Sequence, residues 1–314
     1  MATHLAPAPA ETRSTRHVQM WAWATLAFFV IVVLEGAVVR ATSSGAGCGK
    51  NWPLCNGQIL PSHPAVKTMI EFAHRSLTGI CVLMFAVLIG WTFYATPKRH
   101  IARIASLVAG FLLLTEGALG AVLVLGGYVE KNATAARVFV QGVHFTNTML
   151  LLAAATVVAV LLGDKLYAAD AAPKLRKPIL LTLIATLLTG ATGSVAALAD
   201  TIFPSPNLRA AMAADFAANS PLIIRMRWMH PVTSAIAVLG TLWLIAILRR
   251  NNDSRMATLL MLNVLLQILI GIADVLLLAP TWIQVLHLLS ADMFWITLAA
   301  LAVPVLFPAR NAEA

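Results

Sequence analysis

The sequence predicts an all-α membrane protein whose eight transmembrane helices form two pseudo-symmetric four-helix bundles. Three observations lead to this fold class: a very apolar composition, a series of long apolar runs, and an internal repeat. Of the 314 residues, 60% are hydrophobic and only 11% are charged, whereas soluble proteins carry about 25% charged residues. A water-soluble domain of this length could not bury so much apolar surface, which excludes the soluble classes of protein.

Each of the eight apolar runs has the roughly 20 residues that a helix needs to cross a bilayer. The first run is too long to be the apolar part of a cleavable signal peptide, so we expect it to be retained. A polar tail rich in Pro, Ala and Thr precedes it and is predicted to be disordered. The eight predicted helices cover residues 18–39, 68–94, 101–125, 138–162, 178–198, 228–248, 256–278 and 282–307.

The polar stretches between these helices define the predicted domains. Four consecutive helices form each bundle, and a basic linker joins the two bundles. The predicted divisions are a disordered cytoplasmic tail at 1–17, an N-terminal bundle at 18–165, a cytoplasmic linker at 166–177, a C-terminal bundle at 178–307 and a cytoplasmic tail at 308–314.

The basic residues indicate how the chain is oriented. The net charge of +9 does not point to a nucleic acid partner, because Lys and Arg lie in short loops rather than on one face. Most of them share one side of the membrane with the N-terminus, and the positive-inside rule makes that side the cytoplasm. Both termini are therefore predicted to be cytoplasmic. The tail is not an Arg- and Ser-rich transit segment, which favours a bacterial plasma membrane over a mitochondrial one.

The two halves of the chain repeat one another, because polar residues and glycines recur at matching positions four helices apart. Four is an even number, so both units cross the membrane in the same sense and are related by an axis along its normal. The matched pairs are Glu116 with Gln267, Gly120 with Gly271, Gln141 with Gln284, His144 with His287, and His74 with His230.

Four histidines, His74, His144, His230 and His287, lie near the start of helices that run from outside to inside. At a rise of about 1.5 Å per residue, their depths differ by only a few ångströms, so they should form one layer with two in each bundle. A single histidine there could simply reach toward the headgroups, but four at matched depth indicate a functional site. Imidazoles on facing helices suit an iron porphyrin better than zinc, which needs four close ligands.

One carboxylate stands beside one of these histidines. Glu71 lies one turn before His74 on the same helical face, and the matching position in the second half holds Arg227. Beside a bound macrocycle, Glu71 could take a proton, orient a water molecule or stabilise positive charge. It could equally be solvated or paired with Arg75. Four arginines lie at the outer boundary, where they could bind porphyrin propionates or anchor the chain in the interface: Arg40, Arg75, Arg225 and Arg227.

Two of the three cysteines lie in the predicted first outer loop. In an oxidising compartment Cys48 and Cys55 would form a disulfide, which could be a structural staple or a redox group. Metal binding by this pair is not expected, because no further ligands are nearby. Cys81 lies within the second helix, where it should be a small buried residue. Glu116 and Asp292 lie deep within helices, and no role is predicted for them.

Several of these motifs resemble those of a known family. The stretch VVRATSSGAGC that ends at Cys48, the segment WPLCNG around Cys55 and the segment EFAHR from Glu71 to Arg75 are similar to sequences of the heme A synthases. The other three helix histidines lie on the expected helices, so the resemblance covers nearly the whole chain. Each motif is weak alone, whereas their combination is specific.

The resemblance implies an oxidoreductase that converts the C8 methyl group of heme O to a formyl group by successive hydroxylations, giving heme A for cytochrome oxidase. It implies a permanently bound cofactor, heme b, whose iron takes His230 and His287 as axial ligands. His74 and His144 would be the axial ligands of the iron in the substrate heme. Glu71 would be the catalytic acidic residue.

The resemblance also implies a setting for the protein. Arg75 is a candidate for a propionate contact, and Cys48 and Cys55 match the cysteine pair of the family's first loop. Some members carry a second cysteine pair between the fifth and sixth helices, but residues 200–225 contain none here. The expected partners are the lipid bilayer, a heme O synthase, cytochrome oxidase assembly factors and a membrane electron carrier.

Two other functions fit part of the pattern. A bis-histidine diheme cytochrome for quinone-linked electron transfer would need the same four histidines. The placement of Glu71 in one half and the first-loop pattern argue against it. A transporter would place its polar residues near the bilayer midplane, whereas these histidines are shallow.

Overall fold

The computed structural model describes residues 11–163 and 172–307, which are built from helices and loops without any strand. Eight segments are long and apolar enough to cross a membrane, and α7 and α8 together make one of them. The predicted all-α membrane protein with eight spanning helices is therefore confirmed. The helices are α1 (Glu11–Ala41), α2 (Val66–Ala95), α3 (Ile101–Leu125), α4 (Ala135–Leu161), α5 (Ala172–Ile202), α6 (Leu208–Phe216), α7 (Leu222–Arg225), α8 (Met229–Arg250), α9 (Ser254–Leu276) and α10 (Thr281–Leu306).

Most helix boundaries lie within a few residues of the predicted ones, and α3 begins and ends with its apolar run. The predicted disordered tail and the predicted linker both extend too far. α1 already begins at Glu11 and α5 at Ala172, because Glu, Lys and Arg are good helix formers that continue a helix beyond its apolar run. The remainder of both segments and the predicted C-terminal tail fall in residues 1–10, 164–171 and 308–314, outside the described residues.

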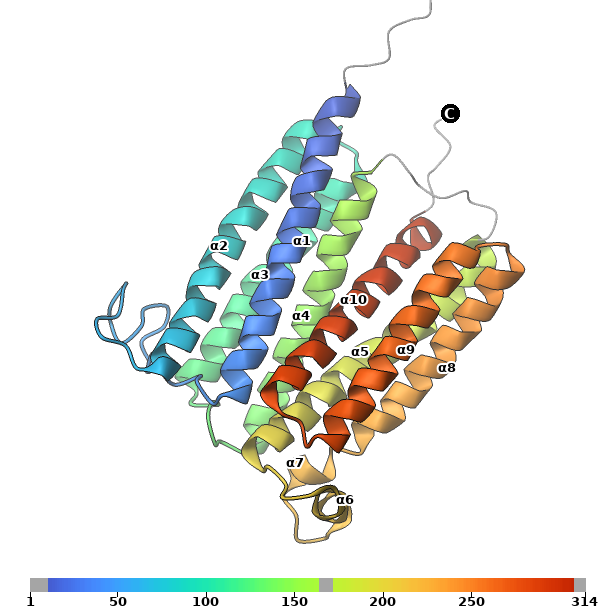
Figure 1. The fold of residues 1–314 in the computed structure, drawn as a ribbon. Helices are drawn as coiled ribbons and strands as arrows, with labels where there is room; N and C mark the ends of the chain where they lie inside the picture. Colours follow the sequence, from blue (N-terminus) through green and yellow to red (C-terminus); the bar gives the residue numbers. More distant parts are fainter. Residues whose placement is uncertain (1–10, 164–171, 308–314) are drawn as a thin grey trace, which may run out of the picture.

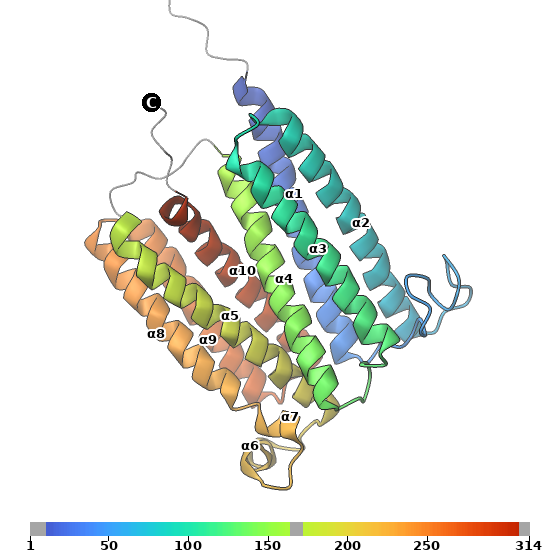
Figure 2. The ribbon, with the colours of Figure 1, turned by 180° about the vertical axis from the view of Figure 1, so that it is seen from behind.

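The helices are arranged in two neighbouring groups (Figure 1 and, from behind, Figure 2). α1 to α4 lie beside one another on one side of the molecule, and α5, α8, α9 and α10 lie on the other. Contacts between the groups run mainly through α4 and α10, which pack against each other and against α1 and α5. The indole N–H of Trp295 on α10 donates to the carbonyl oxygen of Met149 on α4 at 2.7 Å. Pseudo-symmetry between the two groups stays a prediction.

The core of the molecule lies where α4 and α10 meet. In the most apolar stretches of α4 and α10, 50% and 61% of the residues are buried, against 17% and 11% in α3 and α9. Leu151 on α4 and Leu298 on α10 belong to one buried cluster with Phe85 and Leu244. Because lipid tails are as apolar as leucine, close packing rather than the hydrophobic effect holds such a core together. α3 and α9 therefore present most of their surface to lipid.

Two long loops cover the end of the molecule at which α2, α4, α8 and α10 begin, which we call the loop end. The loop between α1 and α2 contains the expected disulfide, which joins Cys48 to Cys55. The loop between α5 and α8 contains two short helices that the apolar pattern does not predict. The first of them, α6, is capped by Asn207, whose side chain accepts a hydrogen bond from the N–H of Ala210 at 2.9 Å.

Candidate functional site

A cavity of about 1770 Å³ extends from the loop end toward the middle of the molecule. Residues from all eight long helices line it, and most of the lining is apolar. All four predicted histidines, His74, His144, His230 and His287, face this cavity. The structure thus brings together the four imidazoles that the sequence predicts to share one layer.

Each of these histidines packs against a glycine on the preceding long helix. The relevant distance runs from the position that a Cβ would take on the glycine to the Cε1 atom of the histidine ring. Below about 3.4 Å a side chain at that position would displace the ring, so three of the four rings depend on a glycine. The pairs are His74 with Gly36 (3.0 Å), His144 with Gly120 (3.9 Å), His230 with Gly193 (2.8 Å) and His287 with Gly271 (3.0 Å).

In the N-terminal group of helices, each histidine lies beside a carboxylate. Nδ1 of His74 on α2 is 3.1 Å from Oε2 of Glu35 on α1, and Nδ1 of His144 on α4 is 3.4 Å from Oε1 of Glu116 on α3. Both contacts cross from one helix to its neighbour. Sequence reasoning missed them because helical periodicity shows which residues share a face of one helix, and it does not show which faces of two helices meet.

In the C-terminal group, the polar partners of the histidines are uncharged. Nδ1 of His230 is 3.1 Å from the carbonyl oxygen of Thr189 on α5, and Nε2 of His287 is 3.3 Å from the amide nitrogen of Gln267 on α9. The rings of His230 and His287 also contact each other, with centroids 6.3 Å apart and planes at 90°. The side chains that the structure describes include no such ring contact between His74 and His144.

The histidines retain capacity for a ligand. Nδ1 of His74, His144 and His287 is buried, and none of the three has an aligned hydrogen-bond partner among the described residues. Buried ring nitrogens normally have one, so these rings are not yet fully satisfied by the protein. A metal between two imidazoles at about 2 Å from each nitrogen would place the ring centres about 6 Å apart, close to the spacing of His230 and His287. The spacing of His230 and His287 therefore fits the iron of a porphyrin bound between them.

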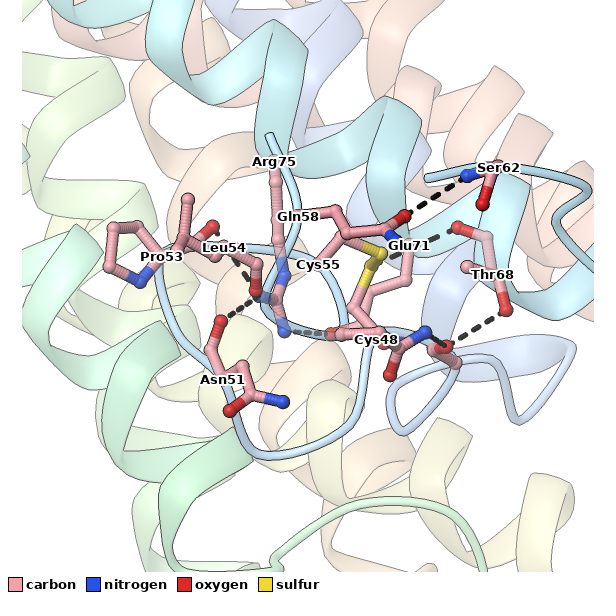
Figure 3. Close-up of a disulfide and its surroundings, with 12 residues drawn as sticks. Cys48, Asn51, Pro53, Leu54, Cys55, Gln58, Ser62, Thr68, Glu71 and Arg75 are labelled. Carbon is pink, nitrogen blue, oxygen red and sulfur yellow. Dashed lines mark hydrogen bonds and ion pairs between the residues drawn. A yellow bond between two sulfur atoms is a disulfide. The ribbon is translucent and has the colours of Figure 1, made fainter. Parts of the chain in front are cut away.

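Glu71, the predicted catalytic residue, lines the same cavity one turn before His74. Its side chain is almost fully buried, and both carboxylate oxygens have partners (Figure 3). Oε2 accepts a hydrogen bond from the backbone N–H of Cys48 at 2.7 Å, and Oε1 accepts one from Nη2 of Arg75 at 2.5 Å. The pairing with Arg75 that the sequence left open is therefore present. In addition, the carboxylate is bound directly to the disulfide loop.

Arg75 is largely committed to that loop. Its Nη1 donates to the carbonyl oxygen of Leu54 at 2.6 Å and lies 3.3 and 3.5 Å from those of Asn51 and Pro53 (Figure 3). Its Nη2 holds Glu71, and its Nε is buried without a partner in the described ranges. Of its five N–H groups, Arg75 therefore has two left for a further ligand, that of Nε and one of Nη2.

Arg40 connects the two groups of helices. From α1, its Nη1 donates to the carbonyl oxygen of Ala197 and the hydroxyl of Thr201 on α5, both at 2.7 Å. Its Nη2 donates to Oε1 of Gln284 on α10 at 2.8 Å. A guanidinium carries five N–H donors in a planar fork, which allows one side chain to hold three acceptors on two helices. Arg40 also lines the cavity, so these hydrogen bonds between the two groups of helices lie at the candidate site.

Arg227, which takes the place of Glu71 in the C-terminal half, closes the loop end on that side. Its Nε donates to Oδ1 of Asp215 on α6 and its Nη1 to Oδ1 of Asp200 on α5, both at 2.7 Å. Its Nη2 donates to the carbonyl oxygen of Ala211 at 3.0 Å. The guanidinium is thus occupied by acceptors of the protein itself. In the C-terminal half, Arg227 therefore joins α5 to α6 at the position where the N-terminal half has the carboxylate of Glu71.

Asp292 is a further buried acid in the cavity wall. It lies on α10 below His287, is 3% exposed, and its Oδ2 has no hydrogen-bond partner among the described residues. Glu116, the other acid deep within the helices, lies beside His144. The described contacts of Asp292 do not indicate a role for it.

A comparison with protein families gives one match that covers most of the chain. The model of the COX15-CtaA family, described as cytochrome oxidase assembly protein, matches residues 19–299. This range contains the four histidines, the cysteine pair and Glu71.

Individual relatives carry two different names. A protoheme IX farnesyltransferase of Thermus thermophilus is 38% identical over 293 residues, which cover 90% of this chain and 47% of the relative. A heme A synthase of Exiguobacterium sibiricum is 32% identical over 168 residues, or 52% of this chain and 54% of the relative. A heme A synthase of Alkalihalophilus pseudofirmus is 32% identical over 148 residues, or 47% of each. The matched part of this chain spans about half the length of these curated relatives.

Proposed function

This chain belongs to the COX15-CtaA family of cytochrome oxidase assembly proteins, and from that premise we propose that it is a heme A synthase. It would oxidise the C8 methyl group of heme O to a formyl group by successive hydroxylations. The observation that carries the proposal is the cavity lined by four histidines, with Glu71 beside one pair and Arg227 at the matching position of the other. The relatives named heme A synthase support it and do not favour a diheme electron-transfer cytochrome.

We propose that His230 and His287 would hold a resident heme b. The 6.3 Å between their ring centroids supports this assignment, because two imidazoles that bind one metal atom are about this far apart. When bound, this heme supplies a one-electron redox centre inside the membrane. The protein contributes a fixed pair of rings, held by Thr189 on one side and Gln267 on the other.

We assign His74 and His144 to the iron of the substrate heme. Among the described side chains these two rings make no contact with each other, unlike those of His230 and His287. Glu71 stands one turn from His74 and provides negative charge at the same wall. There it would stabilise the positive charge that develops at the methyl carbon as electrons are withdrawn. The N–H of Cys48 and the guanidinium of Arg75 hold the carboxylate in place for this role.

We place the protein in a bacterial cell membrane, with both termini in the cytoplasm and the loop end outside. The Cys48–Cys55 disulfide at the loop end supports this orientation, because disulfides persist in oxidising compartments. The functional partners would be the enzyme that makes heme O, cytochrome oxidase assembly factors and a membrane electron carrier that accepts the electrons. A protein named protoheme IX farnesyltransferase contains a segment similar to 90% of this chain, which supports a link to heme farnesylation.

The test is to co-express the chain with a heme O synthase in a host that makes no heme A, and to separate the extracted hemes by chromatography. We expect new heme A with the unchanged chain and none with His74→Ala. The variant His63→Ala is the matched control, because His63 is an exposed loop histidine outside the cavity. Glu71→Gln should retain bound heme and lose heme A formation.

Two results would contradict the proposal. If the unchanged chain binds heme but forms no heme A while heme O is available, the protein is an electron-transfer cytochrome. If Glu71→Gln forms as much heme A as the unchanged chain, Glu71 is not the catalytic residue.

A further inference from the structure

The polar partners of the four histidines differ between the two halves of the cavity. Both histidines of the N-terminal half lie beside carboxylates, with Glu35 3.1 Å from His74 and Glu116 3.4 Å from His144. The histidines of the C-terminal half lie beside a backbone carbonyl and a side-chain amide. The internal repeat matches Glu116 with Gln267. The two halves therefore have a carboxylate and an amide at corresponding positions, each beside a histidine.

Both carboxylates are placed where they can accept a hydrogen bond from a protonated ring nitrogen. The contact in each case is to Nδ1, which leaves Nε2 of the same ring free for a metal. Glu116 is held in position from α4, because its Oε2 accepts a hydrogen bond from Nδ2 of Asn147 at 2.7 Å and its Oε1 accepts one from the hydroxyl of Thr148. Oε2 of Glu35 is buried and has no other partner among the described atoms. Each carboxylate lies within ion-pair distance of Nδ1 of its histidine, at 3.1 Å for Glu35 and 3.4 Å for Glu116.

A carboxylate on Nδ1–H changes the properties of an imidazole that binds a metal. It fixes the tautomer and orientation of the ring and raises the electron donation of the other nitrogen. Stronger donation from an axial ligand stabilises the oxidised iron and lowers its reduction potential, which is one of the ways in which a protein adjusts a heme. The carbonyl of Thr189 on Nδ1 of His230 has a weaker effect, because it carries no full negative charge, and the amide of Gln267 faces Nε2 rather than Nδ1 of His287.

We propose that Glu35 and Glu116 are positioning residues that act through His74 and His144 to make the heme of the N-terminal half the more strongly reducing of the two. This inference rests on the proposed function, because it requires a heme at each pair of histidines. The inference sets the direction of electron transfer between the two hemes. Electrons that leave the substrate half would move downhill toward the pair His230 and His287, where the potential is higher.

The inference is tested by redox titration of the full-length chain in detergent, reconstituted with hemin. The variant His287→Ala, used as the parent, confines hemin to the pair His74 and His144. In this parent we expect Glu35→Gln and Glu116→Gln each to raise the midpoint potential and to alter the low-spin ferric EPR signal. Hemin affinity should fall by about 10- to 100-fold, the usual effect of losing such a partner.

Two further variants separate this effect from a loss of charge or of folding. Glu130→Gln removes a carboxylate that lines the same cavity without contacting a histidine, and it should shift the potential less than either glutamate variant. Gln267→Glu, tested in a His144→Ala parent that confines hemin to the other pair, adds a carboxylate beside His287. It should lower the midpoint potential of that heme.

The outcomes distinguish the inference from the proposed function. If the His287→Ala parent binds hemin but Glu35→Gln and Glu116→Gln leave its potential and EPR signal unchanged, the inference is wrong and the proposed function stands. A shift of equal size in Glu130→Gln would also overturn it. If the parent binds no hemin that depends on His74, both the inference and the proposed function fail.

Discussion

The backbone N–H of Cys48 donates a hydrogen bond to Oε2 of Glu71, with 2.7 Å between the two atoms. A disulfide-bonded loop and a membrane-embedded carboxylate are thereby parts of one structure. Thr68, one turn before Glu71 on α2, strengthens the attachment, because its hydroxyl donates to the carbonyl oxygen of Gly47 at 2.8 Å. The position of the carboxylate in the cavity therefore depends on the conformation of the loop.

The first prediction follows from this attachment. Replacing both Cys48 and Cys55 with Ala should reduce heme A formation while leaving bound heme at its normal level, because the loop would no longer hold Glu71. Closing a loop of this length contributes about 2–3 kcal/mol to stability, so the loop should also be cleaved faster by proteases. Heme A is measured by chromatography, and bound heme by absorbance.

The matched control for this variant is Cys81→Ala, since Cys81 is a buried free cysteine on α2. It should change neither the rate of loop cleavage nor heme A formation. Normal heme A formation in the double variant would show that the disulfide does not position Glu71.

The second prediction concerns the glycines that pack against the histidine rings. In Gly271→Ala the new methyl group would lie 3.0 Å from the ring of His287, so the ring must shift by a few tenths of an ångström and bound heme should fall. In Gly120→Ala the distance to the ring of His144 is 3.9 Å, an ordinary contact. That variant should keep its heme and gain up to about 1 kcal/mol from better helix propensity. The heme-to-protein ratio of the two purified variants is the measurement, and equal ratios would contradict the prediction.

The third prediction concerns the joint between the two groups of helices. Arg40→Gln should lower the stability of the protein in detergent by roughly 2 kcal/mol or more, because hydrogen bonds to a charged group contribute about 1.5–3 kcal/mol each. Thr201 and Gln284 would be left without their donor. The control is Arg209→Gln, at an exposed position on α6. Thermal unfolding at matched detergent concentration measures the difference. Equal unfolding midpoints for the two variants would show that Arg40 does not stabilise the contact between the two groups of helices.

The fourth prediction is a pH dependence at the start of α3. Nδ1 of His100 accepts a hydrogen bond from the N–H of Ala102 at 3.2 Å and caps the helix. Partial burial and the nearby charge of Arg103 lower the pKa of His100. The unfolded chain therefore takes up the proton first, so this stabilisation is complete above about pH 6.5 and is lost as the pH falls through the lowered pKa.

His100→Asn retains a side chain that caps helices well and cannot titrate. Its thermal midpoint should vary less between about pH 5 and pH 7.5, the range in which histidine titrates, than that of the unchanged chain, although other groups contribute a shared background to both. Identical pH profiles for the two proteins would show that His100 does not contribute to the pH dependence.

The sequence was sufficient to predict the helical framework, for a clear physical reason. A bilayer requires that each spanning segment satisfy its own backbone hydrogen bonds, so the apolar runs marked the helices directly. The same logic located His74, His144, His230 and His287 near the starts of their helices. The helix α6 was not predicted, because it lies in a polar loop where the cap Asn207, rather than an apolar run, defines the helix. The helix α7 has only four residues, which are too few to show a helical period.

The contacts between helices could not be predicted in this way. The proximity of Glu35 to His74 depends on how α1 and α2 are rotated against each other. Arg40 was assigned to the membrane boundary, whereas its partners lie on α5 and α10, far away in the chain. Helix rotation is determined by the close packing of small residues, and a single sequence does not reveal which of several apolar faces will meet.

The burial of α10 has a consequence for how the protein is made. This span has the largest buried share, and it packs against α1, α4, α5 and α9, all of which are synthesised before it. Until α10 enters the bilayer, the faces that receive it are covered by lipid, and the carbonyl oxygen of Met149 lacks the indole of Trp295. During translation the earlier spans therefore lack the helix against which four of them pack. A ribosome that stalls before α10 would leave them as a substrate for membrane proteases.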